Sequence, residues 1–208
     1  MRSLLLTGFE PFGGYNVNPS DIIAQELNDT TISHIKIIGK TIPLRFAEIK
    51  SAITQVIDET NPEIIINTGQ ASRPSISIER VAINLADASK VAYNCGTKPN
   101  EKTLVEGGPV AYFSTLPIKY IEKYLKKNDI PCYISNSAGT FGCNQVMYHT
   151  LNYLDSSFRY NSVLAGFIHF PLLPEQIVNS PQSSSMSLDV MRKAITLVIK
   201  CLKNYEKS

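Results

Sequence analysis

The feature that most constrains the fold is a regular alternation of short apolar runs with longer amphipathic stretches. The apolar runs are brief and bounded by Gly, Pro, Asn or Ser, which is typical of buried strands. Strands that alternate with helices predict a largely parallel sheet covered by helices on both faces. We expect strands over residues 3–6, 35–38, 63–67, 132–135 and 163–169.

The amphipathic stretches carry apolar residues at helical spacing. Phe46, Ile49, Ile53 and Ile57 recur every three or four positions, with charged residues between them. The same pattern predicts helices over residues 44–60 and 143–154, around 118–125, and around 191–202. A chain of 208 residues fits one α/β domain, and the carboxyl ends of its parallel strands are where a site is expected.

Charge and apolar run length exclude several classes of partner. The formal net charge is +2 and the basic residues are scattered, so we expect no nucleic acid partner. The apolar runs fall well short of the ~20 residues of a membrane helix, so we expect no membrane association. The N-terminus breaks too soon for a signal peptide, which predicts a cytoplasmic protein. Its four cysteines show no C-x-x-C spacing, so we expect free thiols and no metal site.

One of these thiols follows a run of small and hydroxyl-bearing residues, Ser135-Asn-Ser-Ala-Gly-Thr-Phe-Gly-Cys143-Asn144. The spacing predicts that Cys143 lies in the first turn of a helix, where free N–H groups and the macrodipole favour a thiolate. Those N–H groups would also suit an oxyanion. A buried cysteine that only fills space would look similar, so Cys143 is either a packing residue or a nucleophile.

A thiol nucleophile needs a base, and the chain has three histidines. His149 is six residues beyond Cys143 on the same predicted helix, so it points elsewhere and is expected to be structural or on the surface. His34 stands among hydroxyl-bearing and basic residues. His169 ends a predicted strand at the sheet edge where sites form, and we expect it to be the base.

A carboxylate is expected to orient this imidazole. Glu79 is our candidate because the pair Glu79-Arg80 interrupts an otherwise apolar, strand-like run. The alternative is that Glu79 and Arg80 form a surface ion pair, with Asp87 as the orienting carboxylate. The polar stretch that follows, residues 85–110, is long for a loop and is expected to be functional, mobile or a small hairpin.

Several short motifs follow one another along the chain. They are Thr7-Gly-Phe-Glu-Pro-Phe-Gly-Gly14, Asn18-Pro-Ser20, Gly69-Gln-Ala71, Glu79-Arg-Val-Ala-Ile-Asn84, Gly107-Gly-Pro109, Leu116-Pro-Ile118, Ser137-Ala-Gly-Thr-Phe-Gly-Cys143-Asn144, Gly166-Phe-Ile-His169 and Pro174-Glu-Gln176. In content and order, and almost end to end, the chain resembles pyroglutamyl peptidase I, a family of cytoplasmic cysteine exopeptidases.

The resemblance implies removal of an N-terminal pyroglutamyl residue from peptides. It implies Cys143 as the nucleophile, His169 as general base and acid, and Glu79 as the residue that orients the histidine. It also implies an absence of metal and organic cofactors, and frequently a homotetramer. With the strand and helix pattern, it predicts a single-domain α/β/α sandwich over residues 1–208, with a twisted, largely parallel (mixed) central sheet.

A pyroglutamyl ring calls for flat apolar walls and a few hydrogen bonds to its lactam. We expect Phe9, Phe12 and Phe141 to supply aromatic surface, the two earlier ones from a loop, and Gln70 or loop backbone to supply polar contacts. Gly142 stands where the family usually has an aliphatic residue, and it is expected to line and enlarge the substrate pocket.

Two further departures from the family pattern concern Ser89, where an arginine is common, and the segment carrying Arg73, which is one residue shorter than usual. The alternatives to the implied activity are a cysteine amidase with altered acyl specificity and a non-catalytic homologue.

Overall fold

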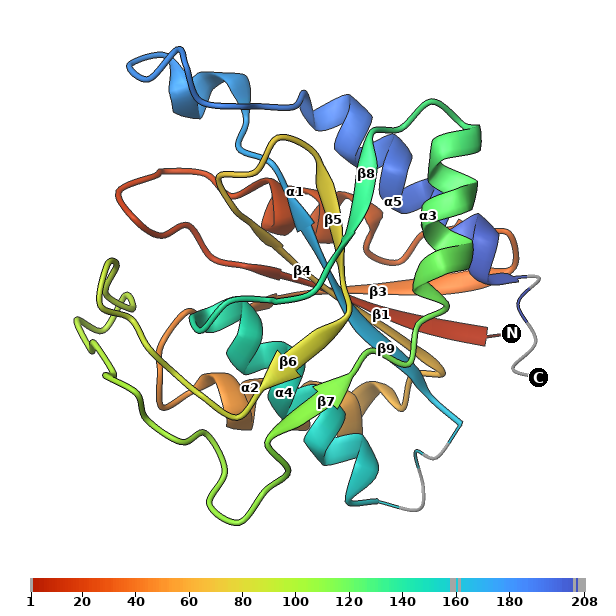
Figure 1. The fold of residues 1–208 in the computed structure, drawn as a ribbon. Helices are drawn as coiled ribbons and strands as arrows, with labels where there is room; N and C mark the ends of the chain where they lie inside the picture. Colours follow the sequence, from red (N-terminus) through yellow and green to blue (C-terminus); the bar gives the residue numbers. More distant parts are fainter. Residues whose placement is uncertain (1, 158–159, 161, 204, 206–208) are drawn as a thin grey trace.

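The computed structural model describes residues 2–157, 160, 162–203 and 205, and it forms a central sheet between two layers of helices (Figure 1). Seven strands make the sheet in the order β2-β3-β1-β4-β9-β5-β8. They are β1 (Arg2–Phe9), β2 (Thr31–Ile32), β3 (Ile35–Ile42), β4 (Ile64–Gln70), β5 (Ile76–Glu79), β8 (Cys132–Ser135) and β9 (Leu164–Phe170). β3, β1, β4 and β9 run parallel, whereas β2 is antiparallel to β3 and β5 to β9. The sheet is therefore largely parallel and mixed, as predicted.

Five helices cover the two faces of this sheet. They are α1 (Pro19–Leu27), α2 (Ile49–Thr60), α3 (Ile118–Lys127), α4 (Gly142–Asp155) and α5 (Leu188–Lys203). Apolar residues of α1, α3 and α5 pack with one face of the sheet in one buried cluster. Those of α2 and α4 pack with the other face in a second cluster, and Figure 1 shows the same two groups on opposite sides. The predicted α/β/α arrangement is confirmed.

All five predicted strands and all four predicted helices are present; the strand over residues 132–135 has the predicted ends, and the others are shifted at one end or both. The second helix begins at Ile49 rather than at residue 44. Sequence analysis missed α1, although Asn18 caps it by accepting from the N–H of Ser20 and Pro19 occupies its first turn, a recognisable helix start. It also missed the short strand β2, and it left the run around Glu79 unassigned.

The long polar stretch of residues 85–110 is the connection of a hairpin. β6 (Val81–Ile83) and β7 (Ala111–Phe113) pair antiparallel on either side of it, and Ala86 bridges Lys102 within it. A backbone hydrogen bond from Asp87 to the carbonyl of Thr140 ties its start to the loop before α4. The expected small hairpin is therefore not contained in the stretch: the paired strands flank it, and within it there is one isolated antiparallel bridge.

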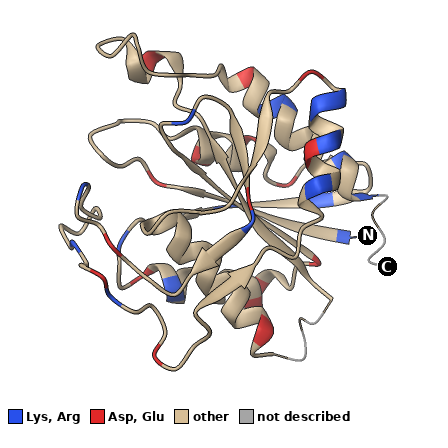
Figure 2. Cartoon of the chain, in the orientation of Figure 1, with Lys and Arg blue, Asp and Glu red and all other residues tan. Residues whose placement is uncertain are grey.

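Charged side chains are dispersed over the molecule. Figure 2 shows basic and acidic positions interspersed along the helices and loops. None of the helices in the described ranges combines the length and the apolar character needed to cross a membrane.

Candidate functional site

Cys143 is the second residue of α4, as the sequence predicts. The chain turns into the helix through Gly139, whose φ of +85° lies in the left-handed region that favours glycine. The residue before the helix, Phe141, makes no side-chain cap hydrogen bond. Phe141 therefore offers no side-chain acceptor to the first N–H groups of α4, and Cys143 in this first turn is 6% exposed.

A glycine on the neighbouring strand makes room for this thiol. A Cβ built on Gly69 of β4 would come within 2.9 Å of the Cys143 Sγ. Gly69 is in register with His169 on the parallel strand β9, so the space above Gly69 and the His169 side chain lie on the same face of the sheet. The fold thus brings the thiol and the imidazole to one face, covered by α4.

His169 is held by the predicted carboxylate. Its Nδ1 lies 2.8 Å from Oε1 of Glu79, and both side chains are buried. β5 delivers Glu79 because it runs antiparallel to β9 with Ser77 opposite His169. Asp87, the alternative carboxylate, instead accepts a hydrogen bond from the N–H of Ser89.

Arg73 joins the carboxylate to the loop that precedes α4. Its Nη1 donates to Glu79 Oε1 at 2.6 Å and to the Ser77 hydroxyl at 2.5 Å, and its Nη2 donates to the carbonyl of Ser137 at 3.1 Å. Ser77 also donates to Glu79 Oε1. Sequence analysis assigned no role to Arg73 or Ser77; the only signal was that Ser77 and Glu79 share one face of a strand.

The alternative of a surface ion pair between Glu79 and Arg80 is wrong. Neighbouring residues of an extended chain point in opposite directions, and Arg80 donates instead to the side chain of Asn136. Glu79 is fully buried beside Arg73 and His169.

Burial and neighbouring charges act against each other in this cluster. Burial favours a neutral Glu79, but the hydrogen bond with His169 and the charge of Arg73 hold the pKa of Glu79 below its ordinary value. Burial lowers the pKa of His169, and Arg73 adds to this, while Glu79 opposes it. The result is a carboxylate that orients a neutral imidazole.

The surroundings of Cys143 do not favour the thiolate that its place at a helix start suggests. Burial raises the pKa of Cys143 to about 12, and the charge of Glu79 adds to this effect. Arg73 and the N–H of Cys143 itself act in the opposite direction without reversing it. Desolvation of the thiol therefore prevails over the helix N-terminus, and the thiol keeps its proton until a base removes it.

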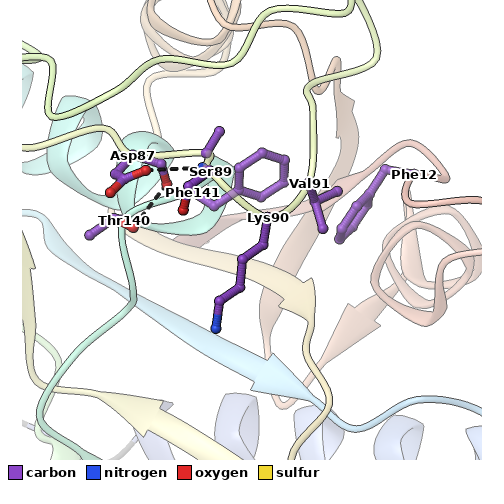
Figure 3. A pocket seen from close by; sticks show the side chains of 8 residues that line it. Phe12, Asp87, Ser89, Lys90, Val91, Thr140 and Phe141 are labelled. Carbon is purple, nitrogen blue, oxygen red and sulfur yellow. Dashed lines mark hydrogen bonds between the residues drawn. The ribbon is translucent and has the colours of Figure 1, made fainter.

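Two of the three predicted aromatic walls line a pocket of about 320 Å³ next to the start of α4. Phe12 and Phe141 approach with ring centroids 5.9 Å apart. Val91 lines the same pocket, and Figure 3 shows Lys90 extending away from these side chains. Phe9 is different: it is the last residue of β1 rather than part of a loop, is 1% exposed, and its ring lies 3.5 Å from the position of a Cβ on Gly69, on the sheet face that Cys143 occupies.

Gly142 does not enlarge this pocket, contrary to expectation. A Cβ on Gly142 would come within 2.2 Å of Leu44 Cδ1 and 3.8 Å of Ile49 Cδ1. Leu44 thus fills the space into which a larger residue at this position would extend. Leu44 therefore compensates for the absence of a side chain at Gly142, in the layer that α2 and α4 form.

Gln70 follows Gly69 on β4, so its side chain points to the opposite face of the sheet from the thiol. There its Oε1 accepts a hydrogen bond from Gln176 at 3.0 Å. The expected contact between the Gln70 side chain and a lactam finds no support in this arrangement.

Asn144 is a further residue that the analysis of the sequence missed. Its amide accepts from the N–H of Ile83 and donates to the carbonyls of Ile83 and Leu85. It thereby fastens the first turn of α4 to β6. The signal in the sequence was its place directly after Cys143.

Comparison with known proteins gives one consistent result. A family model described as pyroglutamyl peptidase matches residues 2–205. The pyrrolidone-carboxylate peptidase of Bacillus mycoides (strain KBAB4) is 45% identical over 207 residues, which cover 99% of this chain and 95% of that protein. The structure of the pyrrolidone carboxyl peptidase from Thermococcus litoralis has a TM-score of 0.92 and 38% identity, covering 97% of this chain and 93% of that one. A mutant of the enzyme from P. furiosus has a TM-score of 0.92 and 39% identity, covering 99% and 100%.

Proposed function

Since the chain belongs to the pyroglutamyl peptidase family, we propose that Cys143 is its nucleophile, His169 its general base and Glu79 the residue that holds the imidazole. The protein is a cysteine-type hydrolase that removes an N-terminal pyroglutamyl residue from peptides. The observation that supports these roles best is the buried contact of 2.8 Å between His169 and Glu79 on the sheet face that the thiol occupies.

The proposed reaction begins with a neutral Cys143 thiol and a neutral His169 imidazole. His169 takes the proton from the Cys143 thiol as sulfur attacks the pyroglutamyl carbonyl, because burial disfavours a free thiolate. The N–H groups of the first turn of α4 stabilise the oxyanion. The imidazolium, paired with Glu79, then gives its proton to the leaving amine, and water hydrolyses the thioester with His169 as base.

Substrate recognition follows from the aromatic pocket. We assign the pyroglutamyl ring to the pocket that Phe12, Phe141 and Val91 line. A lactam has no free amine, so no acidic residue is required to bind an ammonium group. An amidase with a wider acyl pocket is not favoured, because Leu44 occupies the space beside Gly142.

The proposal is tested with a pyroglutamyl coumarin amide, with prolyl and alanyl amides for comparison. We expect turnover of the pyroglutamyl compound alone and its loss in Cys143→Ser. Cys132→Ser and Cys201→Ser are matched controls at other buried thiols and should retain turnover. Full activity of folded Cys143→Ser would refute the assignment of the nucleophile.

The cellular setting is also a proposal. Four free cysteines suit the reducing cytoplasm. The hairpin exposes 87% of Val110 and 70% of Phe113, apolar surface that suits burial between subunits of a homotetramer. Light scattering should give a mass of four chains, and Phe113→Glu should lower it.

A further inference from the structure

A second pocket, of about 330 Å³, lies on α4 away from the catalytic residues. It is formed between α2, α4 and the segment after β6, and we call it the His149 pocket. Six of its lining residues carry the argument: Phe46, Lys50, Lys102, Leu104, Gln145 and His149.

Two buried polar atoms of the residues that line this pocket have no hydrogen-bond partner within the described ranges. His149 is 3% exposed, and its Nδ1 has no hydrogen bond within the described part of the chain. Gln145, one helical turn earlier, is 2% exposed. Its Nε2 donates to the carbonyl of Phe46 at 2.8 Å, which fixes the amide, but its Oε1 accepts nothing from the described residues.

Buried polar groups are nearly always hydrogen-bonded, so these two atoms call for a partner that no described residue supplies. The free Gln145 Oε1 requires a donor. Burial, with the charge of Lys50, lowers the pKa of His149 to about 4, so its ring is neutral and can both donate and accept.

The pocket also has a cationic rim. Lys50 and Lys102 form no ion pair with any described carboxylate. Lys102 Nζ lies 5.2 Å from the centroid of the Phe46 ring. Figure 2 shows basic positions at the start of α2 and along the neighbouring loop. An anionic group is therefore favoured at the rim, and Phe46 and Leu104 offer apolar surface between rim and floor.

We propose that the His149 pocket binds a small carboxylate that carries an amide group. The carboxylate pairs with Lys50 and Lys102, the amide N–H donates to Gln145 Oε1, and the amide carbonyl accepts from the His149 ring. A simple anion such as acetate or phosphate would leave Gln145 unpaired or the apolar wall uncovered. The site uses none of the catalytic residues and does not depend on the proposed function.

The test follows the ¹⁵N signals of the histidine side chains in Cys143→Ser protein during titration with free pyroglutamate, N-acetylglycine, acetate or phosphate. His149→Phe assigns the His149 signal, His34 is the internal control, and His169 reports separately on the catalytic site. We expect amide-bearing carboxylates to shift the His149 signal and to bind at least tenfold more tightly than acetate or phosphate.

Removal of the rim charges is the matched test of the binding mode. Lys50→Gln combined with Lys102→Gln should weaken binding at His149 at least tenfold, whereas Lys123→Gln on α3 should leave it unchanged. A response to pyroglutamate alone would identify the reaction product as the source, and a response to both acids a wider set of N-acylated acids. Equal binding of acetate or phosphate, or no shift of His149, would overturn the proposal.

Discussion

The two buried histidines of the molecule lie in different settings. Each is 3% exposed, and burial lowers the pKa of both. His169 has the carboxylate of Glu79 at Nδ1, whereas no described residue forms a hydrogen bond with Nδ1 of His149, whose pKa falls to about 4. Burial removes the basicity of an imidazole, and one oriented carboxylate counters this effect.

The largest effect is expected from making His169 resemble His149. Glu79→Gln removes the carboxylate charge and keeps the shape, so the imidazolium formed in the reaction loses its partner. We expect kcat to fall by about 10³- to 10⁴-fold, as for comparable triads. Steady-state kinetics with the coumarin substrate give the measurement.

The pH profile of the same variants separates charge from geometry. Because the pKa of His169 is lowered, kcat/KM of the wild type should fall only below pH 6.5, when the imidazole becomes protonated. Glu79→Gln should move this fall to lower pH. A fall at unchanged pH would contradict the comparison with His149.

The second effect concerns Arg73, which bonds to Glu79, Ser77 and Ser137. Arg73→Gln removes charged hydrogen bonds worth about 1.5–3 kcal/mol each, so we expect kcat to fall by about 10- to 100-fold. KM should change little, because Arg73 does not line the aromatic pocket. Arg80→Gln is the matched control on the same segment, and it should retain kcat if Arg73 acts through Glu79.

The third effect concerns Gly142, the first residue of α4, the helix that carries both Cys143 and His149. Gly142→Val places a side chain against Leu44 and should lower the free energy of unfolding by about 1–3 kcal/mol. Leu44→Ala in the same chain should recover part of this loss, because it vacates the contested space. Urea unfolding of both single variants and the double variant measures the coupling, and strictly additive losses would show that the two side chains do not compete.

The smallest effect is a pH dependence of stability at His149. The pKa of His149 is about 4 in the folded chain and 6.5 ordinarily. Between pH 4 and pH 6.5 the imidazole is therefore protonated in the unfolded chain but not in the folded chain, so the free energy of unfolding rises with pH. From pH 7 to 5.5 the wild type should lose about 1 kcal/mol more than His149→Leu. Parallel losses in the two proteins would place the titration elsewhere.

The layers of the fold, and the contact between His169 and Glu79 in the proposed catalytic cluster, could be predicted from the sequence for different reasons. Hydrophobic periodicity identifies strands and helices because burial imposes it along the chain. Cys143 and His169 could be recognised because a helix start and a strand end are local features. Short elements such as β5 and β6 lack enough residues to show a period.

What could not be predicted depends on contacts between distant segments. The pKa of Cys143 is set by how deeply α4 packs on the sheet, which no local pattern reports. The role of Arg73 depends on a loop that returns to Glu79, and the role of Gly142 depends on Leu44, almost a hundred positions away. The unpaired Gln145 and His149 likewise become visible only when their surroundings are known.

The glycine beneath the thiol, Gly69 of β4, has a genetic consequence. Every amino acid that a single base change can substitute for glycine carries a Cβ, and a Cβ on Gly69 would overlap both Cys143 Sγ and Phe167 Cζ at 2.9 Å. No missense mutation at this codon is therefore conservative. A screen of random point mutants should recover no active allele there, although the residue has no side chain and takes no part in the reaction.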